Sequence, residues 1–414
     1  MDRVRRPTSG WLCDHVQTAT GGTGEASWTR GLRSKGARLR PPGGHHPLGL
    51  GADPHQTIRH PVGQPLPGSV GNLVGFPVLP WFSYSMLPLG LIGLGPQWQC
   101  LYKPALQRLR PRLGIRAVFT PIATQAQACC QEWECELQES LRSLIECHDV
   151  QAIVILDTGW FSTIPVEFSC RLGKPVFLAD SLGTLSPELG SVAALAEETG
   201  TMVIPDLLHR HSPATTRLRE LLATRLGKPR AIECDVAVGP SGRLPGFLAN
   251  PWAVAIDWCH AVTGTLPVRV EPAEGLPGQS CLAVQFVPFA DRSLPPLARL
   301  NLISQAEAAS PAVAGTPLIR ARVVCERGVA ELQGHDQISW QSGGTQADER
   351  LGGERSAGEL VLDLFARRVR GGLIPLAELS LGLRSQEWGE LAQASLEAGT
   401  QRRLDSLSSG MRVR

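Results

Sequence analysis

From Leu87 to about Ile204, short apolar runs alternate with segments of helical pattern, and this alternation constrains the fold more than any other feature. Parallel strands need long crossover connections, which are usually helical, so the alternation predicts a parallel sheet. The predicted strands are 87–95, 114–119, 152–156, 176–178 and 202–204, and the predicted helices are 97–109, 124–134, 137–146, 164–172 and 185–199. We therefore expect a doubly wound sheet of the Rossmann type.

After a predicted helix at 214–224, strand-like runs follow one another with little helix between them. These runs are 232–238, 268–271, 281–287, 300–303, 318–326 and 329–332, and two closing helices are expected at 359–368 and 385–399. Such a pattern is typical of an open, mostly antiparallel sheet. The predicted fold class is α/β: a Rossmann-type domain at 86–205, an α+β domain for substrate binding or oligomerisation at 206–404, and a tail at 405–414.

Residues 1–85 have a different composition, with 14 Gly and 10 Pro. Such a segment buries too little apolar surface to offset its ordering entropy, so we interpret it as disordered or as a non-native extension that ends before Met86. The run 73–95 is apolar enough to suggest a membrane span. Pro77, Pro80 and Pro88 argue against a helix there, and we expect no membrane association.

Charge and cysteine content restrict the partners and the compartment. The chain has 40 basic and 38 acidic residues, so no strong overall field favours nucleic acid, and we expect small molecules or other proteins as partners. The 11 cysteines are odd in number and show no recurring spacing, which favours free thiols in the cytoplasm. Cys129, Cys130 and Cys135 come closest to a metal cluster, and we interpret them as thiols without a metal.

The segment Gly93-Leu94-Gly95-Pro96-Gln97-Trp98 lies between a predicted strand and a predicted helix. Glycines are needed there when the backbone turns sharply and its N–H groups approach a pyrophosphate, so we expect Gly93, Leu94, Gly95 and Gln97 to contact NAD or NADP. Trp98 stands where a small residue is usual, and it must either swing outward or fill part of the phosphate space. The alternative is a strand, turn and helix that bind nothing.

Three more residues are assigned to the predicted cofactor site. Thr120 ends the second strand, where an acidic residue usually binds the ribose, and its hydroxyl can still form a hydrogen bond there. Asp157 and Thr158 follow the strand at 152–156.

Several segments, taken in order, resemble the Gfo/Idh/MocA oxidoreductases. These segments are Ala152–Leu156 with the helix after it, Gly173-Lys174-Pro175-Val176, Arg210-His211-Ser212-Pro213, Leu226-Gly227-Lys228-Pro229 and Gly371–Pro375. The resemblance covers about residues 87–404. It implies a Rossmann domain that binds NAD or NADP and a sugar-like ligand between this domain and the open sheet.

The same resemblance shows that all three catalytic positions of the family are replaced. The family's catalytic lysine aligns with Asp180, its aspartate with Asn250 and its histidine with Val254, while Asp257 keeps a further acidic position. An alternative register pairs Asp257 with His260. It needs a deletion, and it spaces the two residues by three positions instead of four.

Hydride transfer from an alcohol needs a group that accepts the hydroxyl proton, and neither Asn250 nor Val254 titrates near neutral pH. We therefore expect an NAD(P)-binding protein whose dehydrogenase activity is lost or altered. Two alternatives stay open: an active oxidoreductase on a sugar or polyol that uses Asp180, Asp257 or His260 as proton carrier, and a structural subunit of a homo- or hetero-oligomer. Trp160, Phe161, Trp252 and Trp258 either line the crevice or pack in the core.

Overall fold

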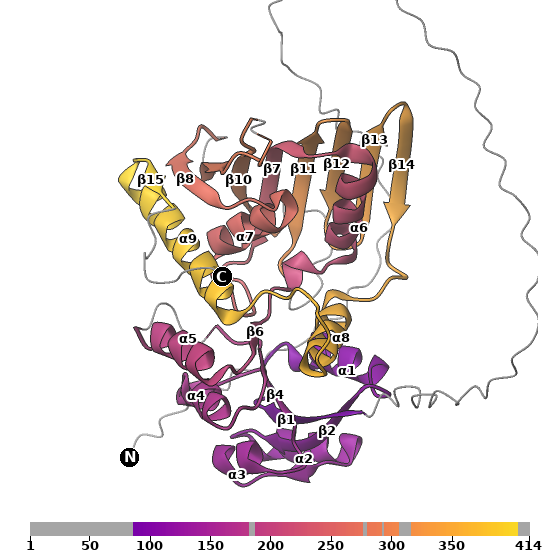
Figure 1. Cartoon of the computed structure of the whole chain (residues 1–414), viewed down its shortest axis with the longest axis vertical. Helices are drawn as coiled ribbons and strands as arrows, with labels where there is room; N and C mark the ends of the chain where they lie inside the picture. The colour runs from indigo at the N-terminus through magenta and orange to yellow at the C-terminus, as the bar shows by residue number, and fades with distance from the viewer. Residues whose placement is uncertain (1–85, 182–186, 276–279, 292–293, 306–315, 405–414) are drawn as a thin grey trace, which may run out of the picture. The chain divides into compact units, whose positions relative to one another are not determined.

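The computed structural model describes residues 86–181, 187–275, 280–291, 294–305 and 316–404 (Figure 1). The predictions for residues 1–85 and 405–414 lie outside this described part. Within it, no helix is long and apolar enough to cross a membrane.

Six strands form a parallel sheet in the order β3-β2-β1-β4-β5-β6, which confirms the predicted doubly wound sheet. The strands are β1 (Leu87–Ile92), β2 (Leu113–Phe119), β3 (Glu136–Leu137), β4 (Ala152–Ile155), β5 (Val176–Leu178) and β6 (Val203–Pro205). The strand order reverses between β1 and β4. Ligands of such sheets bind outside the carboxyl ends of the strands at that point, so the loops after β1 and β4 are where a site is expected.

Helical segments connect these strands. They are η1 (Trp98–Tyr102, a π-helical turn), α1 (Lys103–Arg108), α2 (Ala123–Trp133), α3 (Leu141–Glu146), η2 (Gly159–Phe161, a 3₁₀ turn), α4 (Ile164–Arg171) and α5 (Pro187–Thr199). The prediction of one helix over 137–146 was wrong at its start. Leu137 belongs to β3, and the helix begins only at Leu141 because Ser140 caps it by accepting a hydrogen bond from Ser143 N–H.

The second sheet has nine strands in the order β14-β13-β12-β11-β7-β10-β9-β8-β15. They are β7 (Pro229–Val238), β8 (Pro267–Pro272), β9 (Cys281–Phe286), β10 (Leu297–Ser304), β11 (Ile319–Cys325), β12 (Gly328–Gln333), β13 (Gln337–Ser342), β14 (Thr345–Arg350) and β15 (Arg402–Arg403). Only β7 and β10 pair in parallel, which confirms the mostly antiparallel sheet. Strands β13, β14 and β15 were not predicted from the sequence pattern.

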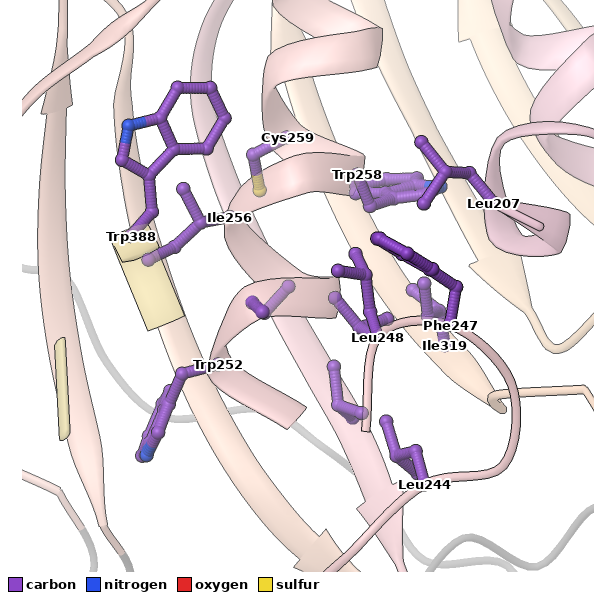
Figure 2. Close-up of a cluster of buried hydrophobic side chains, with 14 of the residues drawn as sticks. Leu207, Leu244, Phe247, Leu248, Trp252, Ile256, Trp258, Cys259, Ile319 and Trp388 are labelled. Atoms are coloured by element: carbon purple, nitrogen blue, oxygen red, sulfur yellow. The ribbon is translucent and has the colours of Figure 1, made fainter. Parts of the chain in front are cut away.

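The remaining helical segments are η3 (Leu208–Arg210, 3₁₀), α6 (Pro213–Leu221), η4 (Leu222–Leu226, π-helical), α7 (Pro251–Thr263), α8 (Ala357–Val369) and α9 (Leu379–Ala398). The apolar helix α7 lies at the centre of a buried cluster (Figure 2), in which Trp252 and Trp258 are almost fully buried. Helix α9 approaches α7 so closely that a Cβ at Gly389 would lie 2.6 Å from the Ala253 Cβ. Trp252 and Trp258 are therefore core residues.

Helix α8 comes late in the sequence but packs against η1 and α1, the helical segments that follow β1. A Cβ at Gly358 would lie 3.1 Å from a methyl group of Leu101, and Arg112 forms an ion pair of 2.5 Å with the buried Asp363. The C-terminal part of the chain thus completes the packing of the helix that follows β1.

Candidate functional site

The loop after β1 requires glycine at two positions because the loop after β4 lies directly against it. Gly93 has φ of +71°, and a Cβ there would lie 2.1 Å from the carbonyl oxygen of Asp157. A Cβ at Gly95 would lie 3.0 Å from the Leu156 carbonyl oxygen. Any larger residue would push the two loops apart.

Beside this loop lies a cleft of about 750 Å³, which we call the glycine-loop cleft. It is lined by the loop after β1 (Gly93, Leu94, Gly95), by the end of β2 and the loop after it (Thr120, Pro121, Ile122), by one face of α2 (Gln125, Ala128, Cys129, Glu132), and by Trp98, Gln99, Lys103, Asp157 and Gly159 among others. Its volume is in the range of pockets that hold a small molecule or a cofactor. Of the residues predicted to bind the cofactor, Gly93, Leu94, Gly95, Thr120 and Asp157 meet here.

Trp98 is buried, with 4% of its surface exposed, so it does not swing outward. Its ring lies 6.4 Å from the ring of Trp133 at the end of α2, and Trp98 is among the residues that line the cleft. Its backbone N–H donates to the carbonyl oxygen of Gly95 over 3.0 Å, which closes the turn.

Three charged side chains border the cleft. Lys103 forms an ion pair of 2.7 Å with Glu132, whose other carboxylate oxygen accepts a hydrogen bond from Gln107. Asp157 lies against Gly93 and Gly95, and its Oδ1 accepts the Gly159 N–H over 2.8 Å. The positive charge of Lys103 and the negative charge of Glu132 cancel, so the negative charge of Asp157 is the one without a counterion in the described lining of this cleft.

A second cavity of about 230 Å³ lies where the loops after β4 and β5 meet the segment 243–249, and we call it the β4–β5 crevice. Its lining includes Gln97, Asp157, Asp180 and Arg243. Asp180 is fixed there, because its Oδ2 accepts hydrogen bonds from the Thr158 N–H (2.7 Å) and hydroxyl (2.5 Å). Gln97 and Asp180 therefore line this crevice, and Thr158 supports its wall through the two hydrogen bonds to Asp180.

The other predicted catalytic residues have structural roles. Asn250 caps α7, since its side chain accepts the Trp252 N–H over 2.9 Å. His260 Nδ1 lies 2.9 Å from the Thr265 carbonyl oxygen, and its ring meets Trp388 edge-on. Burial lowers the pKa of His260. Neither residue is among those that line the cleft or the crevice.

Asp257 is completely buried in a network of hydrogen bonds. Arg210 binds both of its oxygens, over 2.6 and 2.7 Å, while His209 contacts one oxygen and Ser385 the other, each over 2.5 Å. Burial opposes ionisation, but the Arg210 charge and the hydrogen bonds from Arg210 and His209 outweigh it and hold the pKa of Asp257 well below its usual range. Asp257 thus stays a carboxylate that joins η3, α7 and α9.

One ionisable pair near the crevice escaped the sequence analysis. The Tyr102 hydroxyl donates a hydrogen bond to Asp206, which directly follows β6, and both side chains are buried. Burial raises the pKa of Asp206 to about 7, although the Tyr102 hydroxyl and the Leu208 N–H favour its charged form. A Cβ at Gly246, which lines the crevice, would lie 3.5 Å from Asp206 Oδ2. An aspartate directly after a buried strand was the signal that could have drawn attention to it.

No family model matches the sequence, and no curated protein is significantly similar to it. Several solved structures have a fold similar to that of this chain. The match to UDP-N-acetylglucosamine 3-dehydrogenase from Acidithiobacillus ferrooxidans (16% sequence identity, TM-score 0.58) covers 76% of this chain and 99% of the dehydrogenase chain. The match to aldose-aldose oxidoreductase from Caulobacter crescentus (14% identity, TM-score 0.62) covers 77% of this chain and 100% of that one. The match to an NAD binding oxidoreductase from Klebsiella pneumoniae (14% identity, TM-score 0.61) covers 77% of this chain and 99% of that one. The chain has the fold of the Gfo/Idh/MocA-type oxidoreductases.

Proposed function

We propose that this chain, which has the fold of NAD(P)-dependent oxidoreductases, binds a nicotinamide dinucleotide in the glycine-loop cleft and does not catalyse ordinary alcohol dehydrogenation. The glycine-loop cleft carries the proposal. It lies at the carboxyl ends of β1, β2 and β4, and the loop residues Gly93, Leu94 and Gly95 line it where a pyrophosphate would approach a dinucleotide-binding loop.

Two observations support the loss of the usual chemistry. Alcohol oxidation needs a proton acceptor within hydrogen-bond reach of the substrate hydroxyl. Asn250 is occupied as a helix cap, and Val254 is buried and cannot titrate. Asp180 lies in the crevice, but both of its hydrogen bonds come from Thr158 and hold it against the wall.

The β4–β5 crevice is the second part of the proposed binding site. The crevice lies beside the glycine-loop cleft, so a ligand in the crevice would lie next to the nicotinamide end of a dinucleotide in the cleft. We propose that this ligand is a sugar-like molecule. We also propose a cytoplasmic location, because the ten cysteines in the described residues are all free thiols.

Turnover assays test the proposed loss of activity. The protein incubated with NAD⁺ or NADP⁺ and a panel of aldoses, polyols and UDP-N-acetylglucosamine should form no more reduced nicotinamide than a sample without protein. The UDP-N-acetylglucosamine 3-dehydrogenase serves as the positive control for UDP-N-acetylglucosamine. Turnover that Asp180→Asn abolishes would contradict the proposal and would identify Asp180 as the proton carrier of an active oxidoreductase.

A further inference from the structure

Asp157 packs against the glycine loop, which the proposed dinucleotide would approach with its two negative phosphates. A Cβ at Gly93 would lie 2.7 Å from the Asp157 Cβ, and a Cβ at Gly95 would lie 3.6 Å from Asp157 Oδ2. The carboxylate therefore borders the backbone that a pyrophosphate would approach. It also lines both the glycine-loop cleft and the β4–β5 crevice.

On the side of the glycine-loop cleft, no cation among the described lining residues pairs with Asp157, and Arg243 lines the β4–β5 crevice and not this cleft. Its Oδ1 accepts the Gly159 N–H, which fixes the side chain but adds no positive charge. Among the described residues that line the glycine-loop cleft, Lys103 is the only cation, and Glu132 binds it over 2.7 Å. A pyrophosphate in the cleft would therefore meet a net negative wall. The repulsion is moderate because Asp157 is exposed to solvent.

We propose that Asp157 determines the charge selectivity of the glycine-loop cleft: it weakens the binding of ligands that carry a pyrophosphate on the glycines and spares nucleosides that lack one. This inference rests on the proposed nucleotide site. It makes Asp157 a residue that opposes the dinucleotide, whereas the sequence pattern alone assigns it to cofactor binding.

The test is a calorimetric titration of the full chain and of Asp157→Asn with NADH and with adenosine. Asparagine keeps an oxygen for the Gly159 N–H, so the turn is preserved while the charge is removed. We expect Asp157→Asn to lower the Kd for NADH by about tenfold and to leave the Kd for adenosine unchanged. The gain for NADH should shrink in 1 M salt, where charges are screened over about 3 Å.

Asp348→Asn is the matched control, because it removes one exposed carboxylate from β14 in the other sheet and should leave both affinities unchanged. Unchanged or weaker NADH binding by Asp157→Asn, with clear binding by the original chain, overturns the inference and leaves the nucleotide site intact. If neither protein binds adenosine or any of NAD⁺, NADH, NADP⁺ and NADPH, the proposed nucleotide site fails and the inference fails with it.

Discussion

Replacing Arg210 with alanine should lower the free energy of unfolding by about 3–5 kcal/mol, because it leaves a buried carboxylate without its cation. Asp257 is completely buried, and Arg210 supplies two of its four hydrogen bonds along with the neutralising charge. Urea denaturation at neutral pH measures the change. Arg142→Ala is the matched control, since its ion pair with Glu146 is exposed and should contribute less than about 1 kcal/mol.

The double variant Arg210→Met/Asp257→Asn distinguishes the effect of an unpaired buried charge on stability from the effect of lost side-chain packing. Replacing both partners removes the uncompensated charge, so this variant should be more stable than Arg210→Ala alone. A double variant that is less stable than Arg210→Ala would contradict the assignment of Asp257 as a structural carboxylate.

Replacing Asp206 with asparagine should stabilise the protein at pH 8 by about 2–4 kcal/mol and change its stability much less at pH 4. The pKa of Asp206 is about 7 in the folded protein, whereas an unfolded aspartate titrates near pH 3.9. Between these values the folded state keeps a proton that the unfolded state has lost. Stability therefore falls as the pH rises from about 4 to 7, and it levels off above that range.

Urea denaturation of both proteins between pH 4 and pH 8 checks this prediction. All other ionisable groups are common to the two proteins, so the difference between their unfolding free energies isolates Asp206. Tyr102→Phe is the companion variant: it removes the hydroxyl that donates to Asp206 and should destabilise the protein most at pH 8. A difference between Asp206→Asn and the original chain that does not vary with pH would contradict the buried position of Asp206.

The sequence predicted the buried elements much better than the exposed ones. Strands β1 and β4 are almost fully buried and appear as unbroken apolar runs, which is why their positions could be predicted. The edge strand β14 and its neighbour β13 carry Gln, Ser, Thr and Asp at exposed or half-exposed positions, so they lack that signal. Gly343 and Gly344, both with positive φ, form the two-residue turn between them and were the available hairpin signal.

Only the local part of the candidate site could be predicted. Gly93 and Gly95 belong to one short motif, whose place between a strand and a helix is visible in the sequence. The partners of Asp257 and Asp206 could not be predicted, because Arg210 and Tyr102 lie 47 and 104 residues away. Asp257 was a catalytic candidate because it keeps an acidic position of the family and because an alternative register pairs it with His260.

A calorimetric titration of the full chain with NAD⁺, NADH, NADP⁺ and NADPH tests most directly whether the glycine-loop cleft binds a nicotinamide dinucleotide. We predict saturable binding of at least one of them at one site, with a Kd between about 1 μM and 1 mM. Binding should be lost in Gly95→Val, whose Cβ would meet the Leu156 carbonyl oxygen and push apart the two loops that border the cleft, provided that its thermal unfolding stays cooperative. No heat from any of the four at millimolar concentration, together with no thermal shift, would contradict the account.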